Sequence, residues 1–262
     1  FSERVSTVNR GHSLTEMSTM PTNQLGAQET ILKRALNLVA TVVGMCGLRL
    51  DRGAVQIGAT SLGIALSFFL SLTLITNTGG ALIYVVAVWC IYYAGHIIFF
   101  KGGLHHLMHA RLGRDRAWTV YEAALGVVYF NQGWCQAIFL QHYADSLDMP
   151  IPNLLIFLCG AIIFLISTLT KVWATLLVGM DVYYYRDMFL DEAGEGGLAT
   201  TGPYSLFSNP MYGVGLLSMY GAAIDAGSLE GLFVALIFQL SIYLFYGMVE
   251  RPFIRRVYSS HE

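Results

Sequence analysis

The sequence predicts an all-α protein, a polytopic integral membrane helix bundle with about six to seven membrane helices. Of its 262 residues, 55% are hydrophobic and only 12% are charged, whereas a soluble domain carries about 25% charged residues. No charged residue falls between Arg52 and Lys101. That stretch is too long for one span, and the turn-forming residues 76–80 divide it into a hairpin. The net charge of −2 gives no support to a nucleic-acid partner.

The chain opens with a polar segment, residues 1–30, rich in Ser, Thr, Asn and Gln. We expect an N-terminal arm outside the bilayer there, followed by a single membrane domain over 31–262. The apolar stretch 31–48, flanked by basic residues, is either a short span or a helix lying in the membrane interface. Because the sequence does not begin with Met, removal of a targeting segment and import into an organelle is one expectation.

Apolar length and turn signals place the other spans. In chain order they are 54–75, 81–100, 118–141, 154–178, 211–226 and 232–249. The span 118–141 is weaker because it carries Glu122, Asn131, Gln132 and Gln136, and we expect these side chains to face other helices. The span 154–178 is strongly apolar but contains Lys171 in its last two turns.

The distribution of basic residues predicts the topology of this layout. If Arg49 and Arg52 lie inside, the loops 76–80, 142–152 and 225–230 lie outside, and none of them contains Lys or Arg. Every later basic loop then falls on the inner face, as the positive-inside rule requires. The turn 202–215 and the C-terminal tail are therefore predicted to share one face of the membrane.

Two groups of potential metal ligands have simpler explanations. The cysteines are isolated in apolar segments, where packing is expected rather than a disulfide or zinc site: Cys46, Cys90, Cys135 and Cys159. His105 and His109 have the spacing of two ligands on one helix face. A histidine-box iron site needs several such clusters, so we predict no metal site and expect a basic loop that contacts lipid headgroups.

Three polar segments, 181–190, 202–215 and 249–258, are predicted to meet at the inner face. In the second, Asn209 and Pro210 suit the N-cap and first position of a helix, whose free N–H groups favour an anionic group. Gly213 and Gly215 would let a ligand approach the backbone closely. In the third, Glu250 stands at the membrane boundary, where a carboxylate needs a partner.

These segments carry a resemblance to a known family. Gly202-Pro-Tyr204, Asn209-Pro-Met-Tyr212 with its following glycines, and Val249-Glu-x-Pro252 resemble the phospholipid methyltransferases. The phosphatidylethanolamine N-methyltransferase branch is the most similar, and isoprenylcysteine carboxyl methyltransferase is related. The segment Asp181-x-Tyr-Tyr-Tyr-Arg-Asp-Met-Phe189 also resembles that branch, so the resemblance covers roughly Gly179–Tyr258.

The resemblance implies an S-adenosylmethionine-dependent N-methyltransferase acting on phosphatidylethanolamine-type lipids at the membrane surface. We expect an integral membrane location in the endoplasmic reticulum or the mitochondrial inner membrane. The residues that match the cofactor-contacting positions are Tyr204, Asn209, Pro210, Tyr212, Gly213, Gly215 and Glu250. The lipid amine must lose a proton during the transfer, and the candidate catalytic acceptors are Glu250, Asp187 and Tyr185.

One departure from the family pattern keeps a second hypothesis open. The family places a second acidic residue after the one that matches Glu250, and Arg251 stands there in this chain. The alternative is a catalytically inactive, methyltransferase-like accessory subunit that binds lipid within a larger membrane complex, for example a mitochondrial one. A transporter or channel is less favoured, because no predicted span carries paired charges.

Overall fold

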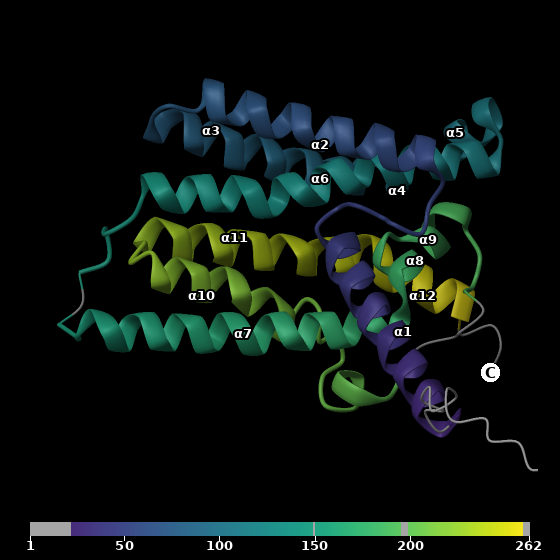
Figure 1. Ribbon diagram of the computed structural model, residues 1–262. Helices are drawn as coiled ribbons and strands as arrows, with labels where there is room; N and C mark the ends of the chain where they lie inside the picture. The colour runs from purple at the N-terminus through teal and green to yellow at the C-terminus, as the bar shows by residue number, and fades with distance from the viewer. Residues whose placement is uncertain (1–21, 149, 195–198, 259–262) are drawn as a thin grey trace, which may run out of the picture. The chain divides into compact units, whose positions relative to one another are not determined.

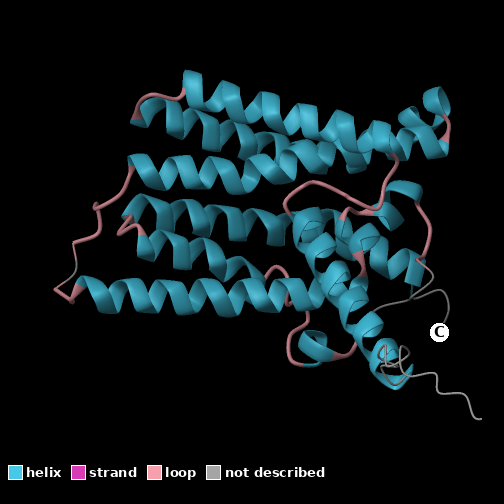
Figure 2. Ribbon diagram, viewed as in Figure 1, coloured by secondary structure: helices cyan, strands magenta, loops and turns pink. Residues whose placement is uncertain are grey.

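The computed structural model describes residues 22–148, 150–194 and 199–258, with side chains from Ile31 onward. Every regular element in these ranges is a helix (Figure 2), which confirms the all-α class. The chain divides into two compact units, one up to Leu38 and one from Val39 to Glu262. The first helix, α1, spans Thr22–Met45 and therefore begins inside the predicted arm, whose residues 1–21 lie outside the described residues. All later elements belong to the second unit.

Within the described residues, four helical stretches are long and apolar enough to cross a membrane. They are α2 (Ala54–Leu74); Thr78–Lys101, made of α3 (Thr78–Trp89), η1 (Cys90–Ala94) and α4 (Gly95–Lys101); α7 (Asn153–Val178); and Leu229–Tyr258, made of α11 (Leu229–Phe245), η4 (Tyr246–Glu250) and α12 (Arg251–Tyr258). Leu66, Phe69 and Leu165 on these helices are all more than half exposed. An apolar outer surface of this extent suits lipid, so the chain is an integral membrane protein. The predicted number of six to seven spans stays a prediction.

Helix α6 (Arg114–His142) lies between the α2–α3 pair and α11 (Figure 1). Its polar side chains face other helices, as predicted. The Asn131 amide donates to the Ser67 hydroxyl of α2 at 3.0 Å, and the Gln136 amide donates to the Met219 carbonyl of α10 at 3.0 Å. These inward polar groups explain why α6 is less apolar than its neighbours.

Helix α10 (Leu217–Asp225) packs closely against α7 because both present small residues at their crossing. A Cβ atom on Gly221 would lie 2.7 Å from the carbonyl oxygen of Gly160. No side chain fits at that distance, so the two glycines allow the backbones to touch.

The connections gather at two ends of the second unit, as the predicted alternation requires. The α2–α3, α6–α7 and α10–α11 connections lie at one end in Figure 1. Backbone hydrogen bonds join two of them, from Asp145 to Ala226 and from Leu147 to Gly227. The opposite end, called here the basic end, carries α5 (Leu104–Leu112), α8 (Met180–Tyr183), α9 (Arg186–Leu190) and the 3-10 turns η2 (Gly202–Ser205) and η3 (Val214–Leu216).

Local capping moves several helix boundaries from their predicted positions. The span predicted from 232 begins at Leu229 because the Ser228 hydroxyl accepts from the Gly231 N–H at 3.0 Å. The helix predicted from 211 begins only at Leu217. The Asn209 side chain does accept from the Tyr212 N–H at 3.1 Å, but this bond closes a turn that precedes the helix, so the predicted helix start at Pro210 is wrong.

Candidate functional site

The three polar segments predicted to share a face do meet, around a cavity of about 250 Å³ at the basic end, the outer cavity. Its wall includes Tyr185 and Asp187 from the first segment, Tyr204 and Asn209 from the second, and Glu250 from the third. These residues are up to 65 positions apart, and the chain folds them into one concave surface with apolar walls and a few polar groups. Such a surface is typical of small-molecule sites.

The first segment reaches the site through a strained residue. Tyr185 has φ of 61° and lies between α8 and α9. The left-handed conformation is uncommon for an aromatic residue and costs on the order of 1–3 kcal/mol. It ends one helix, starts the next and directs the buried Tyr185 ring into the core cluster. The strained backbone of Tyr185 therefore positions a side chain that lines the outer cavity.

A chain of tyrosine hydroxyls ends on Glu250. The Tyr212 hydroxyl donates to Glu250 Oε2 at 2.8 Å. The Tyr185 hydroxyl lies 3.3 Å from that of Tyr212, and the Tyr92 hydroxyl lies 2.9 Å from that of Tyr185. Burial raises the pKa values of Tyr185 and Tyr212 well above 10.0, so both hydroxyls keep their protons at neutral pH. The Tyr212 hydroxyl fixes Oε2 of Glu250 as a hydrogen-bond acceptor, and Tyr185 contacts Tyr212 in turn.

Two π-helical turns place the ends of this hydroxyl chain. Tyr92 lies on η1 and Glu250 lies at the end of η4. Each π-helical turn holds an extra residue, which rotates the following side chains by about 100° relative to a continuous α-helix. The turn η4 also ends two residues before Pro252, whose ring would clash with the carbonyl of a regular helical turn. Both features turn residues of apolar helices toward the site.

Asp187 and Tyr204, two polar residues of the outer cavity, differ in whether their side chains have a hydrogen-bond partner. Asp187 accepts from the Tyr258 hydroxyl at 2.6 Å, so it holds α12 in place. The Tyr204 hydroxyl is buried and has no hydrogen-bond partner among the described residues, and burial raises its pKa. A buried hydroxyl without a partner costs on the order of 1–3 kcal/mol, and a ligand in the outer cavity would remove that cost.

The outer cavity adjoins a smaller one, called here the middle cavity, of about 60 Å³. The two share Tyr185 and Glu250 as wall residues. Tyrosine rings dominate the wall of the middle cavity: Tyr92, Tyr93, Tyr129, Tyr183, Tyr185 and Tyr212. A third space of about 500 Å³, the large cavity, extends between α6, α7 and α10 and shares Gln132 and Lys171 with the middle cavity.

Some of the predicted site residues line a cavity and the others do not. Tyr185, Asp187, Tyr204, Asn209 and Glu250 line the outer cavity, and Tyr212 lines the middle one. Pro210, Gly213 and Gly215 line none of the three cavities. What approaches Gly215 is the stem of Lys171, because a Cβ atom there would lie 3.1 Å from the Lys171 Cβ.

Residues 155–261 match the family model described as phospholipid methyltransferase. The C-terminal part of this chain matches the phospholipid methyltransferase family. The match confirms the resemblance and extends it upstream from 179 to include most of α7.

Several curated relatives carry the same name, phosphatidylethanolamine N-methyltransferase. The Coccidioides posadasii protein is 25% identical over 206 residues, which cover 72% of this chain and 21% of that protein. The Malassezia globosa protein is 31% identical over 142 residues, 54% of this chain and 14% of that protein. The Kluyveromyces lactis protein is 30% identical over 101 residues, 38% of this chain and 12% of that protein. The chain thus spans at most about a fifth of these relatives' length. No solved structure matches it.

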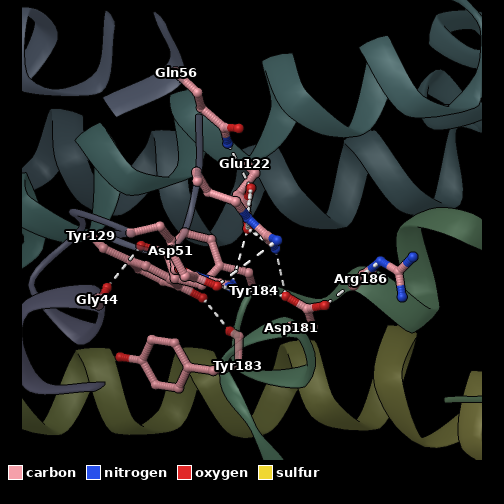
Figure 3. A network of polar contacts seen from close by, with 11 residues as sticks. Gly44, Asp51, Gln56, Glu122, Tyr129, Asp181, Tyr183, Tyr184 and Arg186 are labelled. Atoms are coloured by element: carbon pink, nitrogen blue, oxygen red, sulfur yellow. Dashed lines mark hydrogen bonds and ion pairs between the residues drawn. The ribbon is translucent and has the colours of Figure 1, made fainter. Parts of the chain in front are cut away.

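A buried charge cluster joins Asp181, inside the region that matches the phospholipid methyltransferase model, to charged residues upstream of that region (Figure 3). Glu122 of α6, whose side chain is 1% exposed, pairs with Arg49 at 3.0 Å and with Arg52 at 2.8 Å. Both arginines also pair with Asp181 of α8, at 2.9 and 2.6 Å. Arg49 further binds Asp51, which lowers the pKa of that carboxyl to about 2. The cluster therefore ties the α1–α2 connection and α6 to the segment that carries Tyr185.

The sequence carries signals for this cluster in the depth and charge of its residues. Glu122 interrupts an apolar span near the predicted inner end, where Arg49 and Arg52 were also placed. Equal depth and opposite charge indicate pairing. Two further bonds hold the same region, from the Tyr184 hydroxyl to the Gly44 carbonyl at 2.8 Å and from the Tyr129 hydroxyl to the Tyr183 carbonyl at 2.7 Å.

The histidine cluster does not line the outer cavity. His105 and His109 belong to α5, and neither lines any of the three cavities. In the described ranges, no group of three or more His, Cys, Asp or Glu residues is arranged to hold a metal ion. Burial lowers the pKa of His105.

Proposed function

We propose that this chain is an S-adenosylmethionine-dependent N-methyltransferase that acts on phosphatidylethanolamine-type lipids at the membrane surface. The carrying observation is the outer cavity, where three distant segments bring Tyr185, Asn209 and Glu250 together. The relatives' name, phosphatidylethanolamine N-methyltransferase, supports the reaction class. The membrane helices support a lipid as the acceptor, because the site adjoins the bilayer-spanning segments.

The residues of the outer cavity fit the cofactor. S-adenosylmethionine joins a sulfonium cation to an adenosine with polar ribose hydroxyls. Glu250 offers a carboxylate to the cation, and Asn209 and the unpartnered Tyr204 hydroxyl offer hydrogen bonds. The rings of Tyr246 and Phe253 supply apolar wall for a base. When bound, the cofactor supplies an electrophilic methyl group.

The chain's own residues have to deprotonate and position the lipid amine. The amine attacks only as the free base, and a low-dielectric wall of tyrosine rings disfavours its charged form. In the proposed transfer, Glu250 would take the proton that the lipid amine loses. Tyr212 donates to Oε2 of Glu250, which leaves Oε1 as the oxygen for the proton. No covalent intermediate is needed, since positioning can supply most of the acceleration.

Arg251 does not obstruct this proposal. Its side chain is exposed and lines none of the three cavities, although its neighbour Glu250 lines two. The position at which the family has its second acidic residue therefore lies on the exposed surface of α12 and not in the wall of the outer cavity. An Arg251 side chain inside that cavity would instead have favoured the inactive accessory subunit.

The test is methyl transfer by the purified chain in nanodiscs that contain phosphatidylethanolamine, with methyl-labelled S-adenosylmethionine. Calorimetry with S-adenosylmethionine measures binding in the same preparation. We expect transfer and binding, with Glu250→Gln losing at least about 100-fold in rate and the matched neighbour Arg251→Gln staying within about twofold. Absence of both transfer and binding would refute the proposal.

The accessory-subunit hypothesis makes a different set of expectations. It requires migration on a native gel as part of a much larger assembly, with no cofactor binding. Fractionation of cells that express a tagged chain tests the compartment we expect, the endoplasmic reticulum or the mitochondrial inner membrane.

A further inference from the structure

The middle cavity has a basic side chain that the proposed reaction does not use. Lys171 lies in α7, within a stretch long and apolar enough to span the membrane, and it lines both the middle and the large cavity. Its ammonium nitrogen lies 5.8 Å from the centre of the Tyr183 ring. Among the described residues, no ion pair involves Lys171. A cation at membrane depth without an anion is costly, so an anionic ligand is expected beside it.

The charges around the middle cavity suit a zwitterion. Lys171 and Glu250 both line this small space, and tyrosine rings cover much of the wall between them. A phospholipid with an ethanolamine headgroup carries its phosphate and its amine two carbons apart. The amine belongs near Glu250 by the proposed chemistry, and tyrosine faces attract ammonium groups as methyl groups accumulate. The phosphate then belongs near Lys171.

The large cavity provides space for the rest of such a lipid. It begins at Lys171 and Tyr129 and follows α6 as far as Leu140, about 16 Å along the helix axis. It shares no wall residue with the outer cavity, whereas the middle cavity shares residues with both. The proposed cofactor and the lipid therefore occupy opposite sides of the middle cavity.

We propose that Lys171 binds the phosphate of the lipid substrate in the middle cavity, with the lipid's acyl side in the large cavity. This inference rests on the proposed function for the position of the amine. It makes Lys171 the residue that selects a phospholipid over an amine without a phosphate. The Lys171 stem itself packs against Gly215, where a Cβ atom would lie 3.1 Å from the Lys171 Cβ.

The experiment compares Lys171→Met and Lys171→Arg with the unchanged chain. Both variants keep the Cβ and Cγ atoms that pack against Gly215, and only Lys171→Arg keeps the charge. The probes are short-chain phosphatidylethanolamine and an alkyl ether of ethanolamine, which has the same amine without a phosphate. Binding of each probe is measured by calorimetry in detergent, beside binding of S-adenosylhomocysteine. Lys101→Met is the control, because this exposed lysine at the basic end lines none of the three cavities.

We expect Lys171→Met to bind the phospholipid about 10- to 100-fold more weakly, since it loses a charge-assisted hydrogen bond. Binding of the ether and of S-adenosylhomocysteine should change less than about threefold, and Lys171→Arg should restore most of the phospholipid affinity. Equal loss for both lipid probes, or no loss, would overturn the inference. Charge-dependent phospholipid binding without any methyl transfer would contradict the proposed function and leave the role of Lys171 standing.

Discussion

Removal of the Glu122 carboxylate tests the buried charge cluster most directly. This side chain accepts from Arg49, Arg52 and Gln56, at 3.0, 2.8 and 2.6 Å, and is 1% exposed. In Glu122→Leu the two arginines keep Asp181 but lose their buried counter-charge. Breaking a buried pair from one side costs about 3–5 kcal/mol, because the remaining charge stays desolvated. We therefore expect the free energy of unfolding to fall by that amount.

Reversible unfolding in mixed detergent micelles with increasing sodium dodecyl sulfate measures the loss. Asp148→Asn is the matched control, since Asp148 is an exposed carboxylate at the opposite end, and it should change the stability by less than about 0.5 kcal/mol. The double variant Glu122→Leu with Arg52→Met should recover about 1 kcal/mol or more, because it removes one unpaired charge. A loss below about 1 kcal/mol for Glu122→Leu, or strict additivity in the double variant, would show that the cluster is solvated.

Three further predictions concern single contacts. Tyr212→Phe removes the hydroxyl that donates to Glu250, and we expect the methyl-transfer rate to fall about 10-fold, measured with saturating lipid. Gly221→Val places a Cβ atom 2.7 Å from a carbonyl oxygen of α7 and should cost at least about 2 kcal/mol in detergent unfolding. The carboxyl pKa of Asp51 is depressed by Arg49, so its contribution to stability is full above about pH 4 and is lost as the pH falls toward 2. Asp51→Asn should flatten that acid limb by up to about 1 kcal/mol, because half of the side chain is exposed.

Sequence patterns predicted the fold well where the chain contacts lipid. Apolar runs of about 20 residues placed α2, α7 and the Thr78–Lys101 stretch nearly to their observed ends. Basic loops predicted which connections share an end, because that bias depends on composition rather than on packing. The polar face of α6 was also predictable, since exposing the polar side chains of Asn131 and Gln136 to lipid would cost free energy.

The residues that line the cavities were predictable only in part, because Pro210, Gly213 and Gly215 line none of the three. The motifs identified Tyr204, Asn209 and Glu250 as site residues, and the fold brings these three residues to the wall of one cavity. Composition gave no sign of the π-helical turns, which depend on hydrogen bonds shifted by one residue along otherwise regular helices. The role of Gly215 was also hidden, because Lys171, the side chain that packs against it, is 44 positions away.

The tyrosine chain shows that the region matching the family does not complete the middle cavity by itself. Tyr92 lies on η1, outside residues 155–261, and its hydroxyl is 2.9 Å from that of Tyr185. Tyr92→Phe should lower the methyl-transfer rate several-fold, since Tyr185 and Tyr212 lose the partner that orients them toward Glu250.

Binding of S-adenosylhomocysteine should stay within about twofold in this variant, because Tyr92 lines the middle cavity and not the outer one. Tyr243→Phe, a change of the same kind at an exposed ring of α11, is the control. Weakened cofactor binding in Tyr92→Phe would mean that the hydroxyl chain shapes the outer cavity. An unchanged rate would mean that Glu250 is positioned by Tyr212 alone.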